Sequence, residues 1–284
     1  MALTGLNQLL TNQYLNIPLY FVGNTLNATA ASLFITQNPY PGSRPPSYSG
    51  GTGGFACDIN TSGGLLYGKS FTGDLYITEA DTTPANTAGT LTVVTNSYIG
   101  YVLCDRLWAC SDFKFNTTGV QTVISGGVLP ARDMYGTTSG FGCEIWLEGY
   151  TQNATNSSII TITYTDSYGN TGQTGTASYN NWSNSNNTRP VLMNGYGVRS
   201  IESIQISATG SPTGNLGVTI LRRIMDMPND TRWDKASDLS YLSLGIPKLN
   251  NSGCYYFIEN ALRNPNVGNV SVPTTFVNLK MSLI

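Results

Sequence analysis

Bulky apolar and aromatic side chains are concentrated in three stretches of the sequence. The longest is YIGYVLCDRLWACSDF (98–113), which contains the charged pair Asp105-Arg106, and the others are CEIWLEGY (143–150) and LGVTILRRI (216–224). Runs of this kind are typical of a protein core or of an interface between proteins. We therefore expect these three stretches to form the central strands of one all-β unit.

A period of two along residues 143–150 separates two faces of the strand. Cys143 and the next two odd-numbered residues fall on one face, which we assign to the core. The opposite face presents Trp146 between Glu144 and Glu148. We interpret this second face as a polar surface that is solvated or lies at an interface.

Shorter alternating stretches predict further strands. They lie at 17–22, 73–78, 91–94, 160–165, 174–179, 191–193, 203–208, 255–258 and 275–279. The turn at 166–170 joins two of them in a hairpin. Short strands separated by Gly and Asn turns favour an antiparallel β-sandwich of the jelly-roll or immunoglobulin-like kind. Short helices are predicted at 4–14 and at 237–244, the second ending at Gly245.

The polar stretch 81–88 divides the chain. We predict an N-terminal part (1–89), a β-sandwich core (90–226) and a C-terminal extension (227–284) whose short helix and strands pack on the core. Residues 38–54 are rich in Pro, Gly and Tyr and predict no regular structure. They form either a flexible linker or an extended arm on a neighbour, since prolines lower the entropy cost of an extended chain and tyrosines provide surface to bury.

The charge composition excludes several classes of partner. Charged residues make up 11% of the chain, against roughly a quarter in ordinary soluble domains. The net charge of −2 and the pI near 5.1 provide no basic field for nucleic acid. No apolar run approaches the ~20 residues that span a bilayer, and the N-terminus lacks the pattern of an export signal. We therefore predict neither a nucleic-acid nor a membrane partner.

The five cysteines and the absence of histidine narrow the chemistry. Cys104 and Cys110 have the same parity, so on one regular strand they would point the same way about 20 Å apart, too far for a disulfide or a shared metal. With Cys57, Cys143 and Cys254 they are predicted to be buried free thiols made in a reducing cytoplasm. Without histidine the chain lacks the commonest general base and metal ligand. We predict no cofactor and no metal site.

The acidic residues do not suggest an enzyme. Glu144 and Glu148 share a face but lie about 13 Å apart by strand rise, wider than the carboxylate spacing of either kind of glycosidase. Asp105 and Arg106 are expected to make ion pairs with other segments. The glycine-rich stretch at 50–54 lacks the lysine and helix of a phosphate-binding loop. The sequence therefore predicts a protein without catalytic residues.

The order of several segments resembles tailed-bacteriophage virion proteins of the capsid-associated (decoration or cement) type. After the short helix and the Pro/Gly arm these segments are 105–113, 142–150, 161–174, 197–207, 213–224 and 244–249. In those relatives a DRLW run and a late LRR strand recur, and both are intact here at 105–108 and 221–223. The cysteines beside the first run are a departure from that pattern. These motifs carry structure and no known chemistry.

The resemblance implies a virion structural protein on the capsid exterior, assembled in the cytoplasm of a host bacterium. Its partners would be the major capsid protein and further copies of itself, as a homotrimer because capsid lattices offer three-fold sites. The residues that we single out as candidates for a partner interface are Tyr40, Arg44, Pro45, Pro46, Tyr48 and Trp146.

The same sequence is compatible with two other functions. A tail- or fibre-associated adhesin would use exposed tyrosines and Trp146 as a platform for host glycans. A secreted lectin or surface domain would require an export signal that the sequence does not show.

Overall fold

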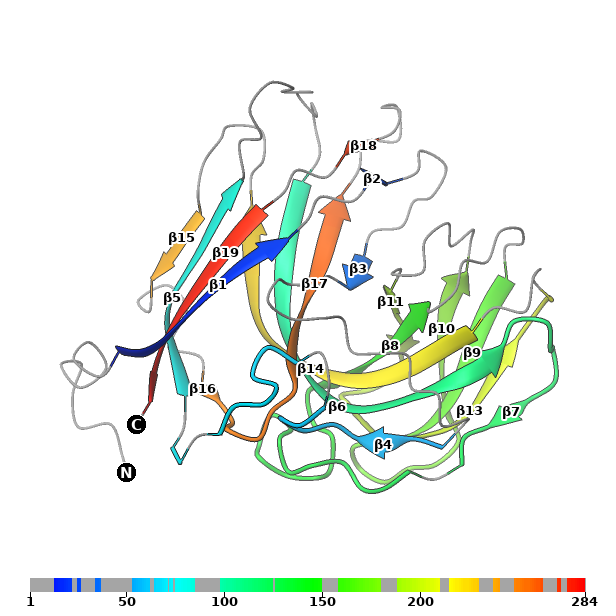
Figure 1. Ribbon diagram of the computed structural model, residues 1–284. Helices are drawn as coiled ribbons and strands as arrows, with labels where there is room; N and C mark the ends of the chain where they lie inside the picture. The colour runs from blue at the N-terminus through cyan, green and yellow to red at the C-terminus, as the bar shows by residue number, and fades with distance from the viewer. Residues whose placement is uncertain are drawn as a thin grey trace.

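The computed structural model describes most of the central part of the chain and shorter pieces of both ends. The described residues are 13–21, 25–26, 34–36, 53–61, 64–70, 72–73, 75–84, 98–124, 126–149, 158–179, 188–209, 215–229, 237–240, 248–262, 270–271 and 275–283. Every regular element among them is a strand, and the ladders between named strands are antiparallel. The predicted all-β, antiparallel sandwich class is confirmed (Figure 1).

The largest sheet is built around two long strands. Its order is β11 (Thr188–Pro190), β8 (Cys143–Gly149), β14 (Asn215–Asn229), β6 (Tyr98–Lys114), β17 (Tyr255–Leu262) and β3 (Phe34–Thr36), and β4 (Phe55–Ala56) also pairs with β6. The three stretches predicted to be central are β6, β8 and β14, and they are consecutive in this sheet. Their apolar runs form strands because side chains on both faces of the sheet are buried.

The second sheet completes the sandwich. Its order is β12 (Leu192–Met193), β10 (Gln173–Tyr179), β9 (Ser158–Asp166), β13 (Val198–Ile206) and β7 (Gln121–Thr122). The predicted hairpin is β9–β10. The main core lies between the two sheets, where Ile145 and Ile220 of the large sheet belong to the same buried cluster as Ile162 and Ile204 of the second. This is the expected arrangement of two apolar faces packed against each other.

A third sheet combines the two ends of the chain. It consists of β1 (Gln13–Phe21), β19 (Thr275–Leu283), β5 (Leu75–Pro84) and β15 (Ser237–Ser240), with β16 (Lys248–Leu249) also on β5, while β18 (Val270–Ser271) pairs with β2 (Thr25–Leu26). In Figure 1 this sheet stands beside the upper halves of β14, β6 and β17. Strand pairing therefore joins the predicted N-terminal part, core and C-terminal extension, because β5 pairs with β19 and β17 pairs with β6.

Local predictions at the two ends of the chain need correction. Ser237–Ser240, predicted to begin a helix, is strand β15, because its backbone pairs with β5. The polar stretch predicted to separate two parts begins inside β5, which continues to Pro84. Of the predicted N-terminal helix, the last two residues belong to β1, and the rest lies outside the described residues, as do most of 38–54.

The ladder between β6 and β14 contains three irregularities. Leu107 is an extra residue in β6 between the pairs Arg106–Leu221 and Trp108–Ile220. One extra residue turns the following side chains to the other face of a sheet. Cys104 and Cys110 therefore belong to different buried clusters, and the prediction that they point the same way is wrong.

Candidate functional site

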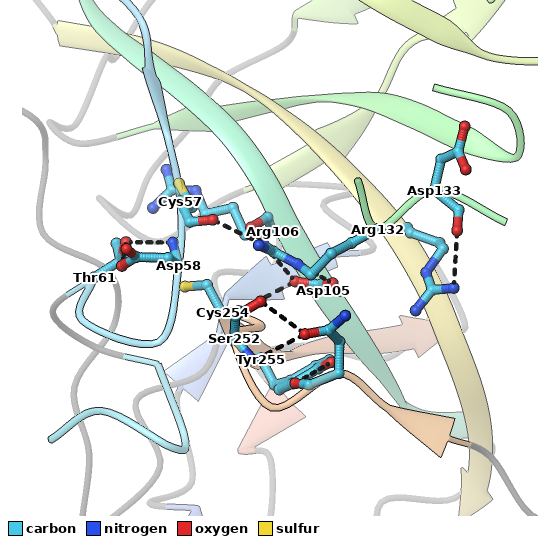
Figure 2. A network of polar contacts seen from close by, with 12 residues as sticks. Cys57, Asp58, Thr61, Asp105, Arg106, Arg132, Asp133, Ser252, Cys254 and Tyr255 are labelled. Atoms are coloured by element: carbon cyan, nitrogen blue, oxygen red, sulfur yellow. Dashed lines mark hydrogen bonds and ion pairs between the residues drawn. The ribbon is translucent and has the colours of Figure 1, made fainter. Parts of the chain in front are cut away.

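The most extensive polar network lies around Asp105 and Arg132 (Figure 2). Arg132 Nε donates to Asp105 Oδ2 at 2.9 Å, and its NH2 group donates to Oδ1 at 3.1 Å. The side chain of Asp105 is 0% exposed and that of Arg132 is 3% exposed. The pair is therefore a buried two-point ion pair between strand β6 and the loop that follows Pro130.

The same two side chains also hold neighbouring backbone groups. Arg132 NH2 donates to the carbonyl oxygens of Cys57 at 2.8 Å and Arg106 at 3.2 Å. Asp105 Oδ1 accepts a hydrogen bond from the backbone N–H of Cys254 at 3.1 Å. Four separate segments of the chain thus meet at one ion pair.

Burial and pairing act in opposite directions on this ion pair. Burial raises the pKa of Asp105, and the guanidinium of Arg132 only partly offsets that rise. Burial also works to lower the pKa of Arg132, but the charge and hydrogen bonds of Asp105 raise it overall. Each side chain therefore depends on the other to remain charged in the interior.

A second buried ion pair lies on the other side of β6. Arg106 NH2 donates to Glu148 Oε2 at 2.5 Å, and Arg106 Nε donates to the hydroxyl of Thr219 at 3.0 Å. Thr219 belongs to β14, which separates β6 from β8, so the contact connects three adjacent strands. The prediction that Asp105 and Arg106 make ion pairs with other segments is confirmed for both residues.

All five cysteines are buried free thiols, as predicted. Burial raises the pKa of Cys57 and of Cys143 to about 12 and raises those of Cys104, Cys110 and Cys254 as well. A thiol with a raised pKa and no access to solvent is neither a nucleophile nor a metal ligand near neutral pH. In the described part of the chain no three Cys, Asp or Glu side chains form a group that could hold a metal ion.

Trp146 occupies a position that differs from the predicted one. It lies on the face opposite the main core, as the alternation required, but it is only 1% exposed. It belongs to a second buried cluster with Leu221 and Tyr256, its indole N–H donates to Glu144 at 2.9 Å, and the guanidinium of Arg223 lies 6.0 Å from its ring centroid. In this structure Trp146 is therefore unavailable to a partner or a glycan.

A pocket of about 440 Å³ lies next to the Asp105–Arg132 pair. Its lining includes Arg132, Asp133, Met134, Arg222, Arg223 and Lys248. Four of these six side chains are cationic and one is anionic. The backbone carbonyl of Asp133 accepts a hydrogen bond from Arg222 NH1 at 3.3 Å, while its carboxylate has other partners. We refer to this cavity as the basic pocket.

Asp133 fixes the loop beside the basic pocket. Its carboxylate accepts hydrogen bonds from the backbone N–H groups of Tyr135, Thr137, Gly140 and Phe141 and from the hydroxyl of Thr137. Burial alone would raise the pKa of Asp133, but these hydrogen bonds together lower it below its usual value. The loop is thus held by a single ionised side chain.

This loop presents an exposed aromatic cluster. The ring of Phe141 lies between the rings of Tyr135 and Tyr168, at centroid distances of 5.5 and 5.2 Å. Tyr135 and Tyr168 are 70% and 69% exposed, and Tyr196, whose backbone carbonyl accepts a bond from Gly142, is 82% exposed. The carboxylate of Asp166 fixes the turn that contains Tyr168, because it accepts hydrogen bonds from the backbone N–H groups of residues 168 and 170. Several tyrosines therefore stand in solvent on loops that are fixed from beneath.

Of the residues predicted to lie at a partner interface, the structure describes only Trp146. Tyr40, Arg44, Pro45, Pro46 and Tyr48 lie outside the described residues, and their role stays a prediction. The prediction from the sequence did not include the basic pocket or the aromatic cluster. The sequence does contain a pattern that indicates the aromatic cluster, because Asp133 and Asp166 each lie two residues before a tyrosine in a turn that contains glycine. No local signal links Arg132 to Asp105.

Comparisons with known proteins give few relatives. The sequence matches no family model and no curated protein. Among solved structures, the chain is similar to the VP2 subviral particle of infectious bursal disease virus, with a TM-score of 0.23 and 10% identity over 95% of this chain and 80% of that chain. It is also similar to T=1 particles derived from the same virus, with a TM-score of 0.21 and 12% identity over 96% and 78%. Likenesses at these TM-scores carry no argument about function.

The described residues include no helix with the length and apolarity needed to cross a membrane.

Proposed function

We propose that this protein is a structural component of a bacteriophage particle, bound to the outside of the capsid as a decoration or cement protein. The observation that supports this proposal best is that the two sequence runs that resemble such proteins lie next to each other in the structure. DRLW (105–108) lies in β6 and LRR (221–223) in β14, and these strands pair so that Arg106 faces Leu221 and Asp105 faces Arg222. The two runs are therefore one contiguous piece of the fold.

The use of the buried charges supports a structural role. Asp105, Arg106, Arg132 and Glu148 connect strands and loops in the interior, and their charges are paired with each other. Such groups stabilise one arrangement of the chain, whereas a catalytic group must reach a substrate. In this proposal the N-terminal part up to residue 89, including the 38–54 arm, contacts the shell or a neighbouring copy, and the protein is a homotrimer.

The experiment is a cryo-EM reconstruction of the intact particle. Under the proposal, density on the capsid surface follows the paired side chains of β6 and β14, with the arm laid over the major capsid protein. A stable monomer in light scattering that does not cosediment with particles lacking it would refute both the trimer and the shell contact.

A second function, adhesion to the host, is favoured by the aromatic cluster. Rigidly held tyrosines provide contact area and hydroxyl groups at low entropy cost, and their rings can stack on sugars as well as on protein. If the protein is an adhesin, its density in the cryo-EM reconstruction lies on the tail or baseplate, and the isolated protein binds host cells. Substitution of Tyr135 and Tyr168 by alanine would abolish that binding while leaving the fold intact.

A further inference from the structure

The loop between β12 and β13 contains the only Asn-Gly dipeptide of the chain, Asn194-Gly195. Both residues are exposed. Gly195 has a φ of +133°, a conformation that residues with a side chain rarely adopt. A Cβ built on Gly195 would meet no atom within 4 Å apart from those of its chain neighbours. The backbone that follows Asn194 is therefore uncrowded and open to water.

The side-chain amide of Asn194 differs from that of another exposed asparagine in a turn, Asn170. Among the described residues, the structure shows a hydrogen bond of Asn194 only at its backbone carbonyl, which accepts from the hydroxyl of Tyr164 at 2.9 Å. In contrast, the side-chain amide of Asn170 donates to Asp166 Oδ2 at 2.9 Å. The residue after Asn170 is the β-branched Thr171, whose side chain crowds its own backbone nitrogen. Asn194 therefore combines a side chain without a hydrogen bond with an accessible neighbouring nitrogen.

The hydrogen bond from Tyr164 favours attack by that nitrogen. The carbonyl oxygen of Asn194 and the nitrogen of Gly195 belong to one peptide group, so negative charge on the nitrogen is shared with the oxygen. A hydroxyl that donates to the oxygen stabilises this charge. Burial raises the pKa of Tyr164, so its hydroxyl keeps the proton and continues to donate in mildly alkaline solution.

We propose that Asn194 is a site of spontaneous deamidation in the folded protein, with water as the only co-reactant. The nitrogen of Gly195 loses its proton to hydroxide and attacks Cγ of Asn194, ammonia leaves, and a succinimide ring forms. Water then opens the ring. Cleavage of the bond from nitrogen to Cγ gives aspartate, and cleavage of the bond from nitrogen to the backbone carbonyl carbon gives isoaspartate. In the net reaction a side-chain amide and water become a carboxyl group and ammonia.

The loop is fixed on both sides of the reactive peptide group. The hydroxyl of Tyr164 binds the carbonyl of Asn194, and the N–H of Gly142 donates to the carbonyl of Tyr196 at 3.2 Å. In isoaspartate the backbone runs through Cβ and Cγ, so it is one bond longer between these two points. Either product also places a negative charge beside Tyr196, which is 82% exposed. Deamidation therefore changes both the charge and the path of an exposed loop. The inference goes beyond the proposed function, since the reaction needs only this loop and water.

The test is peptide mapping by mass spectrometry of the full-length protein during incubation at pH 8 in water enriched in heavy oxygen. We expect Asn194 to gain the mass that corresponds to replacement of NH2 by OH, with the heavy oxygen incorporated. Isoaspartate should be part of the product and accept a methyl group from isoaspartyl methyltransferase. The rate should lie within about tenfold of the rate in a synthetic peptide of residues 190–199, which corresponds to a barrier difference of at most ~1.4 kcal/mol. Asn170 is the matched control in the same protein and should convert at least about tenfold more slowly.

A variant and the reaction products separate the outcomes. Asn194→Gln keeps an amide on an exposed side chain, so it keeps the fold, but the ring that would close is larger, and conversion at this position should be lost. A rate in the folded protein more than about a hundredfold below that of the peptide would overturn the proposal, because the fold would then protect Asn194. Equal conversion of Asn170, or a product without isoaspartate, would overturn it as well.

Discussion

Removal of Arg132 should destabilise the protein more than removal of any exposed arginine. In Arg132→Met, Asp105 stays in the interior, and among the described residues it keeps only the backbone N–H of Cys254 as a hydrogen-bond donor. The carbonyl oxygens of Cys57 and Arg106 also lose a donor. Breaking a buried ion pair on one side costs about 3–5 kcal/mol, because the remaining charge is uncompensated. That is a large share of the ~5–15 kcal/mol by which native proteins are stable.

The sign of the pH dependence follows from the same geometry. Burial already raises the pKa of Asp105, and loss of the guanidinium raises it further. A carboxyl whose folded pKa exceeds its unfolded value of ~3.9 costs nothing while it is protonated in both states. The cost appears as the pH rises above that value. The destabilisation by Arg132→Met should therefore be smallest near pH 4, where the two unsatisfied carbonyl oxygens remain, and should grow as the pH rises to 8.

The assay is urea unfolding followed by the fluorescence of the buried Trp108 and Trp146, from pH 4 to pH 8. Arg199→Met is the matched control and should change the free energy of unfolding by less than about 0.5 kcal/mol. Adding Asp105→Asn to Arg132→Met should restore stability at pH 7, since a neutral amide needs no counter-charge. A loss below about 1 kcal/mol, or one that is the same at all pH values, would refute the reasoning.

Three further predictions concern other parts of the fold. The cysteines should resist a thiol reagent at pH 8 until urea unfolds the protein, because all five are buried and burial raises their pKa values, that of Cys57 to about 12. Rapid labelling of the native protein would contradict this. Asp133→Asn should lower stability at pH 6, as measured by urea midpoints. Its difference from the wild type should begin to shrink near pH ~4, the unfolded pKa, and should disappear as the pH falls through the lowered folded pKa, because the carboxylate contributes stability only while it is ionised. Trp146→Ala should cost about 3–5 kcal/mol in the same assay, whereas Tyr196→Ala, at an 82% exposed side chain, should cost less than about 0.5 kcal/mol.

The central strands could be predicted because their signal is local. The run 98–113 is apolar on both faces, which is the pattern of a strand covered on both sides, and the structure has β6 over nearly the same residues. In β8 the alternation correctly separated the face of Ile145 from that of Trp146. It did not reveal that Trp146 is buried in a second cluster, because the other members of that cluster come from β6, β14 and β17, which are distant in the sequence.

The remaining features depend on tertiary contacts that a single sequence does not display. Ser237–Ser240 has residues that suit a helix start, yet pairing with β5 selects a strand. The extra residue Leu107 reverses the faces of β6 without any local marker. The partner of Asp105 is an arginine 27 positions away in a loop without periodicity. The sequence therefore predicted that Asp105 and Arg106 form ion pairs with other segments. It did not predict which residues are their partners.

The long ladder of β6 and β14 has a mechanical consequence. It runs from Asn215 opposite Lys114 to Asn229 opposite Ile99, so the same two strands pass through the sandwich and continue beside the third sheet. At ~3.4 Å per residue a strand of this length reaches about 50 Å. A force that pulls β6 at one end of the ladder and β14 at the other, along the strands, loads the hydrogen bonds between them in shear. These two strands can therefore slide past each other only if many of the hydrogen bonds between them break together.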